Sequence, residues 1–166
     1  TILSLAPKIP IAKIEELLNT KEIARMIPNA TSYINKGYNP VSFHPTINAE
    51  LKKNLMQLFA SLGEIFEVKE SQLEAYAIIS AMLPTYFWFQ WEEIEKLGVK
   101  MGLNEDECRQ TIYETLKVSL DLFYKSELNH SEVIDLIPVK PVAEMEEFVK
   151  KQYEEKLVGL FNKIKP

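Results

Sequence analysis

The order of hydrophobic and polar residues predicts short strands alternating with helices in the first part of the chain. Apolar runs over residues 1–6, 23–27, 40–43 and 64–68 favour strands. Helical spacing appears over residues 11–18 and again, more clearly, over residues 48–62. On the second helix, one face is expected to carry Leu51, Leu55, Leu58 and Leu62, with Met56 and Phe59 beside it. Gly63 follows at the position of a left-handed C-cap. Strands that alternate with helices through short loops predict a parallel sheet with crossover helices.

After about residue 70, the pattern predicts helices and no further strand. The apolar stretch over 71–97 contains Pro84, which is expected to kink or split the helix. Asn104 is expected to cap a helix with an acidic first turn, and the apolar face of that helix comprises Ile112, Leu116, Leu120 and Phe123. A short helix is expected over 131–137, and Pro141 is expected at the first position of the last helix. The sequence therefore predicts an α/β part followed by an all-helical part.

Length and charge narrow the class of protein. The 166 residues suffice for one ordinary domain or two small ones. A net charge of −5 argues against nucleic acid or an anionic membrane as the main partner. The single cysteine excludes a disulfide framework and suits a reducing compartment, so a cytoplasmic protein is expected. Because the chain begins inside an apolar strand, at Thr1, we expect it to be a fragment.

Few residues suggest reactive chemistry. His44 and His130 have no metal-binding partner at ligand spacing, so both are interpreted as surface or loop histidines and no metal is expected. Cys108 lies among acidic residues, which disfavour a thiolate, and is interpreted as a packing residue.

An aromatic cluster over residues 86–91 precedes three glutamates, Glu92, Glu93 and Glu95. One of them could act as a general acid beside an apolar pocket, but a solvated helix face is the favoured interpretation. The consecutive aromatic residues cannot all face one core, so at least one side is expected to meet another helix, another subunit or a ligand.

Three segments, in this order, resemble pyrroline-5-carboxylate reductases. Residues 24–30 (Ala-Arg-Met-Ile-Pro-Asn-Ala) resemble the family's segment Arg-Val-Met-Pro-Asn-Thr-Pro. Residues 58–64, followed by Val68, resemble its Leu-Phe-x-x-x-Gly-x-x-x-x-Val crossover. Residues 98–103 (Gly-Val-Lys-Met-Gly-Leu) repeat the family's turn residue for residue.

The resemblance implies an enzyme that reduces a cyclic imine with NADP or NAD as cofactor, in proline biosynthesis. Residues 1–69 would then be the late strands and helices of a Rossmann-type domain. Residues 70–166 would be a helical dimerisation domain like the C-terminal domain of 6-phosphogluconate dehydrogenase, so that the fold is mainly helical. The resemblance also implies a small-molecule substrate, a homodimer formed through the helical domain, and no metal. The family's Gly-x-Gly-x-x-Gly turn would lie upstream of Thr1.

Site residues follow from the same resemblance. Pro28 and Asn29 match the nicotinamide side of the cofactor site, and Ser80, Pro84 and Tyr86 match the substrate loop. Ser80, Thr85 and Tyr86 are expected to position the substrate, although Thr85 stands where the family has Ala. The family's Ser-Gly-Ser-Gly-Pro-Ala-Tyr is here Ser-Ala-Met-Leu-Pro-Thr-Tyr, over residues 80–86. A second loop, Ser-Pro-Gly-Gly-Thr-Thr, is replaced over residues 137–142. Glycine allows backbone amides to approach a carboxylate closely, so these replacements predict an altered substrate pocket.

Two functions therefore stay open. The chain is either the C-terminal portion of an NAD(P)-dependent oxidoreductase or a non-catalytic helical dimerisation or regulatory module derived from that scaffold.

Overall fold

The computed structural model describes all residues from Thr1 to Pro166, and these pack as two compact units. The first unit combines Thr1–Pro84 with Lys151–Pro166, and the second is Thr85–Lys150. The boundary expected after residue 69 stays a prediction, since it concerns family relationship rather than packing.

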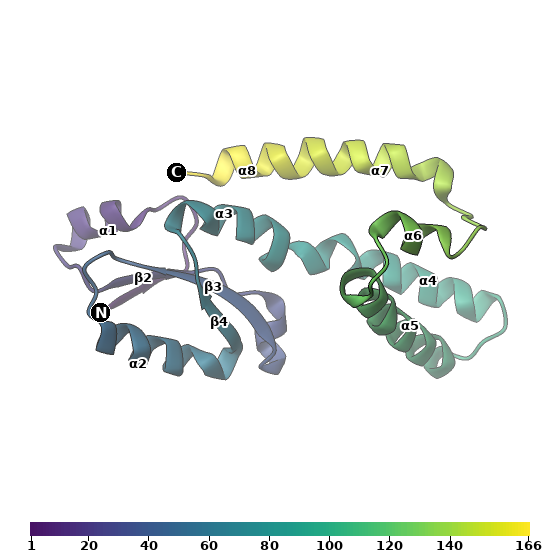
Figure 1. Ribbon diagram of the computed structural model, residues 1–166, viewed down its shortest axis with the longest axis horizontal. Coiled ribbons are helices and arrows are strands. Elements are labelled where there is room, and N and C mark those ends of the chain that lie inside the picture. The colour runs from purple at the N-terminus through teal and green to yellow at the C-terminus, as the bar shows by residue number, and fades with distance from the viewer. The chain divides into compact units, whose positions relative to one another are not determined.

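A four-stranded sheet forms the centre of the first unit (Figure 1). Its strands, in spatial order, are β1 (Ile2–Ser4), β2 (Ile23–Met26), β3 (Gly37–Phe43) and β4 (Gly63–Glu67). β1 and β2 are parallel, as are β3 and β4, but β2 and β3 are antiparallel.

The antiparallel pair corrects the expectation of an all-parallel sheet. Only residues 27–36 connect β2 to β3, and this connection contains a short 3₁₀ helix, Ala30–Ile34. A parallel crossover needs about a dozen or more residues, so this short connection returns the chain in the opposite direction.

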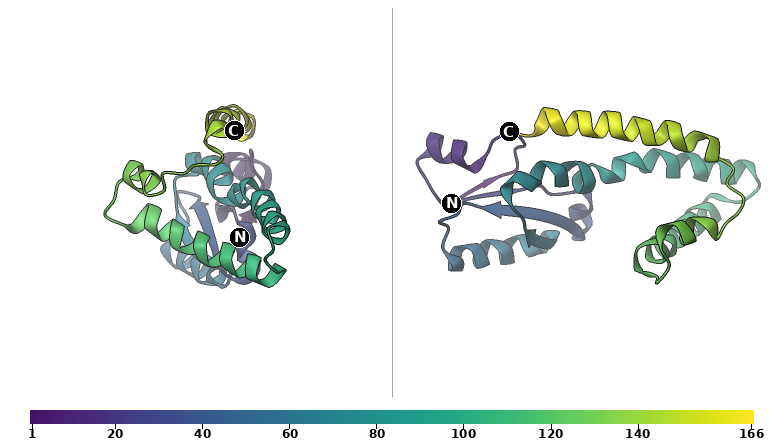
Figure 2. Two further views of the ribbon diagram at one scale, coloured as in Figure 1. Left: turned by 90° about the vertical axis from the view of Figure 1, so that its right-hand side faces the viewer. Right: turned by 45° about the horizontal axis from the view of Figure 1, so that its top comes forward.

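Helices cover both faces of the sheet, and Figures 1 and 2 show α2 on one face and α1 and α3 on the other. The helices of this unit are α1 (Ile11–Leu18), α2 (Ala49–Phe59), α3 (Leu73–Tyr76) and α8 (Gly159–Ile164). Beneath α2, the core consists of Ala24, Met26, Val41, Phe43 and Phe59. On the opposite face, Ile11 and Ile14 of α1 pack against Ile23, while Leu73 and Ala77 pack with Ile27 and Ile164.

α2 is shorter than expected because its last turn tightens into a 3₁₀ helix, Ala60–Leu62. Leu58 was expected on the buried face of α2, and this prediction was wrong, because its side chain is 67% exposed. Phe59 is the buried residue at this end of the helix. Gly63 has φ of 123°, and a side chain there would overlap the backbone of Gly37. Only glycine tolerates both conditions, so Gly63 allows β4 to begin directly beside β3.

A buried ion pair joins β2 to α3. Arg25 is 1% exposed, and its guanidinium donates to the Glu74 carboxylate at 2.7 Å and to the Glu70 carboxylate at 2.8 Å. The same group donates to the carbonyl of Ala6 at 3.3 Å, and Glu70 also accepts from the backbone N–H of Ile11 at 2.6 Å. One cation therefore fixes β2, α3, the N-terminus of α1 and the loop before it.

His44, which was expected to be a surface or loop residue, is buried after the end of β3. Its Nδ1 accepts from the Thr46 backbone N–H at 3.1 Å, so the proton lies on Nε2, which donates to Glu15 at 3.0 Å. The imidazole thereby ties α1 to the turn before α2, and its role in the structure is to hold these segments together.

The second unit is helical and consists of α4 (Trp88–Lys100), α5 (Glu105–Lys125), α6 (His130–Asp135), a 3₁₀ turn (Ala143–Met145) and most of α7 (Glu146–Tyr153). Pro84 ends the preceding helical segment, as expected: a 3₁₀ turn, Leu83–Tyr86, separates it from α4.

Asn104 caps α5 by accepting from the N–H of Glu107, as the acidic first turn indicated. Cys108 is a buried packing residue, and a Cβ on Gly98 would lie 2.6 Å from its sulfur, so this glycine lets α4 and α5 pack closely.

Pro141 does not open the last helix, as had been expected. Val142 is the N-cap of the 3₁₀ turn, and the turn precedes α7. The helix continues through a π-helical segment, Glu154–Val158, into α8. Every helix in the structure is either too short or too polar to cross a lipid bilayer.

The Arg25 ion pair generates a prediction about stability. Glu74→Ala leaves a buried guanidinium with one carboxylate fewer, and should lower the free energy of unfolding by about 3 kcal/mol. Urea denaturation of the 166-residue chain measures this loss. Glu16→Ala, which removes a pair between exposed groups with Lys13, should change the same quantity by less than about 0.5 kcal/mol. Equal losses for the two variants would contradict the role given to Glu74.

Candidate functional site

The candidate site lies where β2 ends and β3 begins. After Met26 the chain continues through Ile27 to Pro28, which lacks an N–H donor, so the ladder cannot extend further. Asn29 then caps the following 3₁₀ helix, its Oδ1 accepting from the backbone N–H and the hydroxyl of Thr31 at 3.1 and 2.6 Å.

Asn39, on β3, holds this turn from inside. Its side chain is fully buried, and its Oδ1 accepts from the backbone N–H of Asn29 and from the Ser32 hydroxyl, each at 3.0 Å. The Asn39 amide nitrogen has no hydrogen-bond partner. Sequence reasoning missed Asn39, because the predicted strand began only at Pro40 whereas β3 begins at Gly37.

Asn29 and Ser80 are 51 residues apart in sequence and meet at the edge of the sheet where β2 ends and β3 begins. The Asn29 side-chain amide donates to the Ser80 hydroxyl at 3.3 Å, and the Ser80 hydroxyl donates to the Tyr38 carbonyl at 3.1 Å. Ser80 lies in a π-helical segment, Ala77–Ala81, that follows α3. Such segments occur frequently at functional sites. The structure thus brings together a residue expected on the cofactor side and one expected on the substrate side.

The other expected substrate residues lie elsewhere. Thr85 and Tyr86 belong to the second unit, where the Tyr86 carbonyl accepts from the Gln90 side chain at 2.6 Å. Pro28 directly precedes Asn29 and is half-buried. The first unit therefore contains Pro28, Asn29 and Ser80, and the role of all five residues stays a prediction.

Glu92 fits the solvated helix face better than the role of general acid. Its carboxylate is exposed and pairs with Lys96 at 2.8 Å; the hydrogen bond from Lys96 lowers the pKa of Glu92. A general acid at neutral pH requires a raised pKa, so this environment acts in the wrong direction. Glu95 is likewise paired, with Arg109 at 3.0 Å.

The groups at the edge are a hydroxyl, a carboxamide and a backbone carbonyl, so the site can orient a polar ligand but supplies no proton donor that titrates near neutral pH. Pro28 and Asn29 lie at this edge, and their expected role on the nicotinamide side of a dinucleotide stays a prediction. None of the chain's five glycines belongs to a sequence motif typical of a phosphate-binding turn. The chain contains no cluster of three or more side chains suited to hold a metal ion.

Comparison with known proteins identifies relatives of one kind, although no family model matches the chain. The chain is 31% identical over 116 residues to pyrroline-5-carboxylate reductase 1 of Bacillus subtilis, a match that spans 69% of this chain and 39% of the relative. It is 23% identical over 132 residues to the Staphylococcus aureus pyrroline-5-carboxylate reductase, covering 79% of this chain and 49% of the relative. The chain thus spans less than half the length of these curated relatives.

Solved structures share the fold over 98% of this chain. The Plasmodium falciparum pyrroline carboxylate reductase, solved with NADP bound, superimposes with a TM-score of 0.77 at 22% identity over 67% of its own length. The Streptococcus pyogenes 1-pyrroline-5-carboxylate reductase gives 0.78 at 19% identity over 64% of its length.

These matches confirm the resemblance inferred from the three motifs and the expected fold class, late Rossmann strands and helices followed by a helical domain. The chain is therefore a relative of the pyrroline-5-carboxylate reductases in sequence, and it has their fold.

Proposed function

We propose that this chain forms the C-terminal portion of an NAD(P)-dependent oxidoreductase. Residues 1–69 would complete a Rossmann-type cofactor domain, and residues 70–166 would form a helical domain for dimerisation and substrate binding. The hydrogen bond between Asn29 and Ser80 is the observation that supports this proposal most directly, because it joins the expected cofactor side to the expected substrate side. In open α/β sheets, ligands bind beyond the carboxyl ends of parallel strands, which is where β1 and β2 end.

The proposed reaction is hydride transfer to the carbon of a C=N or C=O group in a small molecule. The bound cofactor would supply the hydride, and this chain's residues would hold the reactants. Pro28 and Asn29 would contact the nicotinamide, while Ser80, Thr85 and Tyr86 would position the substrate. Asn39 would act through Asn29, since it holds the Asn29 backbone at 3.0 Å.

The substrate is proposed to differ from pyrroline-5-carboxylate. Residues 81–83 carry side chains where the family has Gly-Ser-Gly, and these side chains obstruct the approach of a carboxylate to the backbone. The second loop, over 137–142, has also lost its glycines and threonines.

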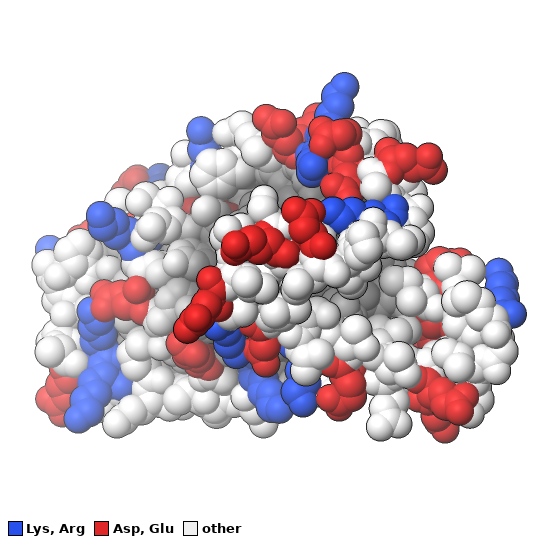
Figure 3. All heavy atoms as spheres, turned by 45° about the vertical axis from the view of Figure 1, so that its right-hand side comes forward, with Lys and Arg blue, Asp and Glu red and all other residues white.

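The second candidate, a non-catalytic dimerisation module, depends on an apolar surface of the helical unit that could form a dimer. Large apolar side chains on α4 and α5 are exposed, among them Phe89 (66%), Ile94 (51%) and Leu120 (58%). A groove of about 580 Å³ between these helices is lined mostly by apolar groups, including Trp88, Trp91 and Leu116. Figure 3 shows acidic and basic side chains interspersed, with wide uncharged areas between them. The packing of α4 against α5 leaves these apolar side chains exposed, so a homodimer through the helical unit is proposed for either candidate.

The 166-residue chain should bind NADPH with a dissociation constant above about 100 μM, because it lacks the turn that anchors the pyrophosphate. Isothermal calorimetry measures this directly. Micromolar affinity would contradict the proposed division of the cofactor site.

An assay of the complete natural protein carrying this chain, with NADPH and pyrroline-5-carboxylate or other cyclic imines, separates the two candidates. If the protein is the proposed oxidoreductase, Ser80→Ala should lower kcat/KM at least tenfold for the accepted substrate, because a hydrogen bond in the site is lost. Ser71→Ala, at an exposed position in the same unit, should leave kcat/KM unchanged. A stable dimer with neither turnover nor cofactor binding would favour the module instead.

Sedimentation of the 166-residue chain at tens of micromolar should show a dimer. Leu120→Glu should weaken the dimer at least tenfold, because a charge would have to be buried in an apolar contact. Tyr33→Glu, at a 95% exposed position of the first unit, serves as the control and should leave the dimer intact. A monomer for the unmodified chain would refute the proposed dimer.

A further inference from the structure

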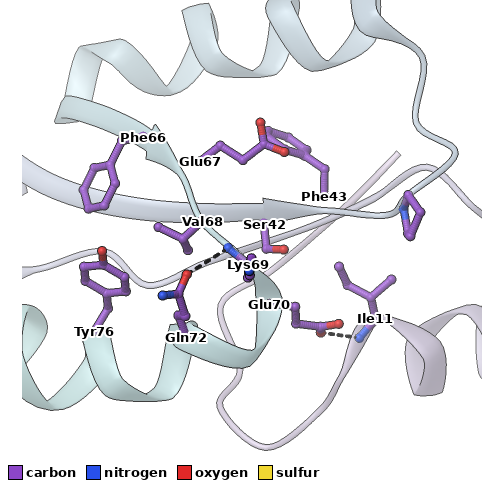
Figure 4. A pocket seen from close by; sticks show the side chains of 11 residues that line it. Ile11, Ser42, Phe43, Phe66, Glu67, Val68, Lys69, Glu70, Gln72 and Tyr76 are labelled. Carbon is purple, nitrogen blue, oxygen red and sulfur yellow. Dashed lines mark hydrogen bonds between the residues drawn. The ribbon is translucent and has the colours of Figure 1, made fainter.

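A hollow of about 760 Å³ lies on the first unit where β3 and β4 end. Figure 4 shows Ser42 near its middle, with Phe66 and Tyr76 on one side and Phe43 and Ile11 on the other. Lys69, Glu70 and Gln72 contribute from the segment after β4.

The hollow is separate from the Asn29–Ser80 edge. Asn29 contacts the start of β3, through Tyr38 and Asn39, whereas the hollow adjoins its end, at Ser42 and Phe43. Five residues of extended strand between Tyr38 and Phe43 span about 16 Å. A ligand of moderate size therefore occupies one place or the other.

Ser42 gives the first indication of a ligand. Its residue is only 4% exposed, it lines the hollow, and its hydroxyl makes no hydrogen bond within the chain. Solvent reaches this hydroxyl, so it opens onto the hollow and can donate a hydrogen bond to an acceptor that is bound there.

The charged side chains that line the hollow indicate the charge of the ligand group that would bind there. Glu70 is already engaged by Arg25 and by the backbone N–H of Ile11, and Glu67 pairs with Lys52 of α2. Lys69 is exposed and forms no ion pair. The carboxylates are thus neutralised by the protein, whereas the Lys69 ammonium is still available.

The uncharged polar side chains of the hollow also favour a negatively charged ligand, because they can donate hydrogen bonds to it. The Gln72 side-chain oxygen accepts from the Lys69 backbone N–H at 3.3 Å, which leaves its NH₂ group as a donor toward the hollow. The Tyr76 hydroxyl also lines the hollow and makes no hydrogen bond within the chain. With Ser42 and Lys69, four groups can therefore donate to one ligand.

Aromatic rings form the apolar walls. The Phe66 and Tyr76 rings meet edge to face, with 5.4 Å between their centroids, and Phe43 lies across the hollow beneath the Lys52 ammonium. Such walls favour a flat apolar body on the ligand.

We propose that this hollow binds a small molecule that joins one carboxylate to a flat apolar body. The carboxylate would pair with Lys69 and accept from Ser42, Gln72 and Tyr76, while the apolar part would lie between Phe66 and Phe43. A dianion such as a phosphate monoester is disfavoured, because Glu67 and Glu70 line the same hollow. This binding is independent of the proposed reductase activity.

The test uses 3-phenylpropanoate as probe and the ¹⁵N-labelled 166-residue chain. The carboxylate should shift the amide resonances of residues 42–45 and 66–72, and should bind at least tenfold more tightly than 3-phenylpropan-1-ol, 3-phenylpropylamine or phenyl phosphate. Equal affinity for the alcohol, tighter binding of the amine or the phosphate, or shifts confined to other residues would overturn the proposal.

Substitutions of the lining residues test which side chains bind the carboxylate of the probe. Lys69→Gln should weaken binding of the probe about tenfold, and Ser42→Ala should weaken it several-fold, since each removes one donor to the carboxylate. Lys36→Gln, at another exposed lysine without an ion pair, should leave the affinity unchanged. Unchanged affinity in Lys69→Gln would also overturn the proposal. None of these measurements involves NADPH, so their failure would leave the proposed function standing.

Discussion

The buried guanidinium of Arg25 is the constraint on which the first unit depends. A charge removed from water is tolerated only when it is paired and hydrogen-bonded, and here two carboxylates and a backbone carbonyl accept from the two terminal nitrogens, while the Nε–H has no partner. The acceptors come from two segments, the loop at Ala6 and residues 70–74, so both must hold their positions for these hydrogen bonds to form. The ion pair thereby specifies how α3 lies on the sheet.

The candidate site follows from that placement. Asn29 lies four residues after Arg25 on one chain segment, and Ser80 lies six residues after Glu74 on the other. With Arg25 and Glu74 joined, the two segments run from a common point, and their next polar side chains meet beside the Tyr38 carbonyl. The same network also reaches the hollow at the far end of β3, because Glu70 is shared between Arg25 and Ile11. An ion pair that is structural in itself therefore shapes both places where a ligand is proposed.

Much of the local structure was predictable because the signals are local. The strand at Ile23–Met26, the helix at Ile11–Leu18 and the cap at Asn104 each depend on residues within one or two turns of the chain. Predictions failed where the exact bounds of an element or a partner distant in sequence decide. The direction of β3 depends on the length of the connection before it, and the exposure of Leu58 depends on how the sheet lies beneath α2. His44 lies in a loop, as one of its two interpretations had it, but its burial depends on Glu15 and on the turn at Thr46, which a linear reading does not connect with it.

The sequence by itself determined the family relationship, the order of strands and helices, and the two residues, Asn29 and Ser80, that proved to be neighbours. It could do so because motifs and hydrophobic periodicity are properties of short segments. Only the tertiary structure decided that these two side chains bond to each other, that Asn39 supports them, and that Ser42 and Lys69 line one hollow. Each of those facts depends on which groups, distant in sequence, are brought together. That is settled only when the segments have packed, because a polar group that is taken out of water then needs a partner from another segment.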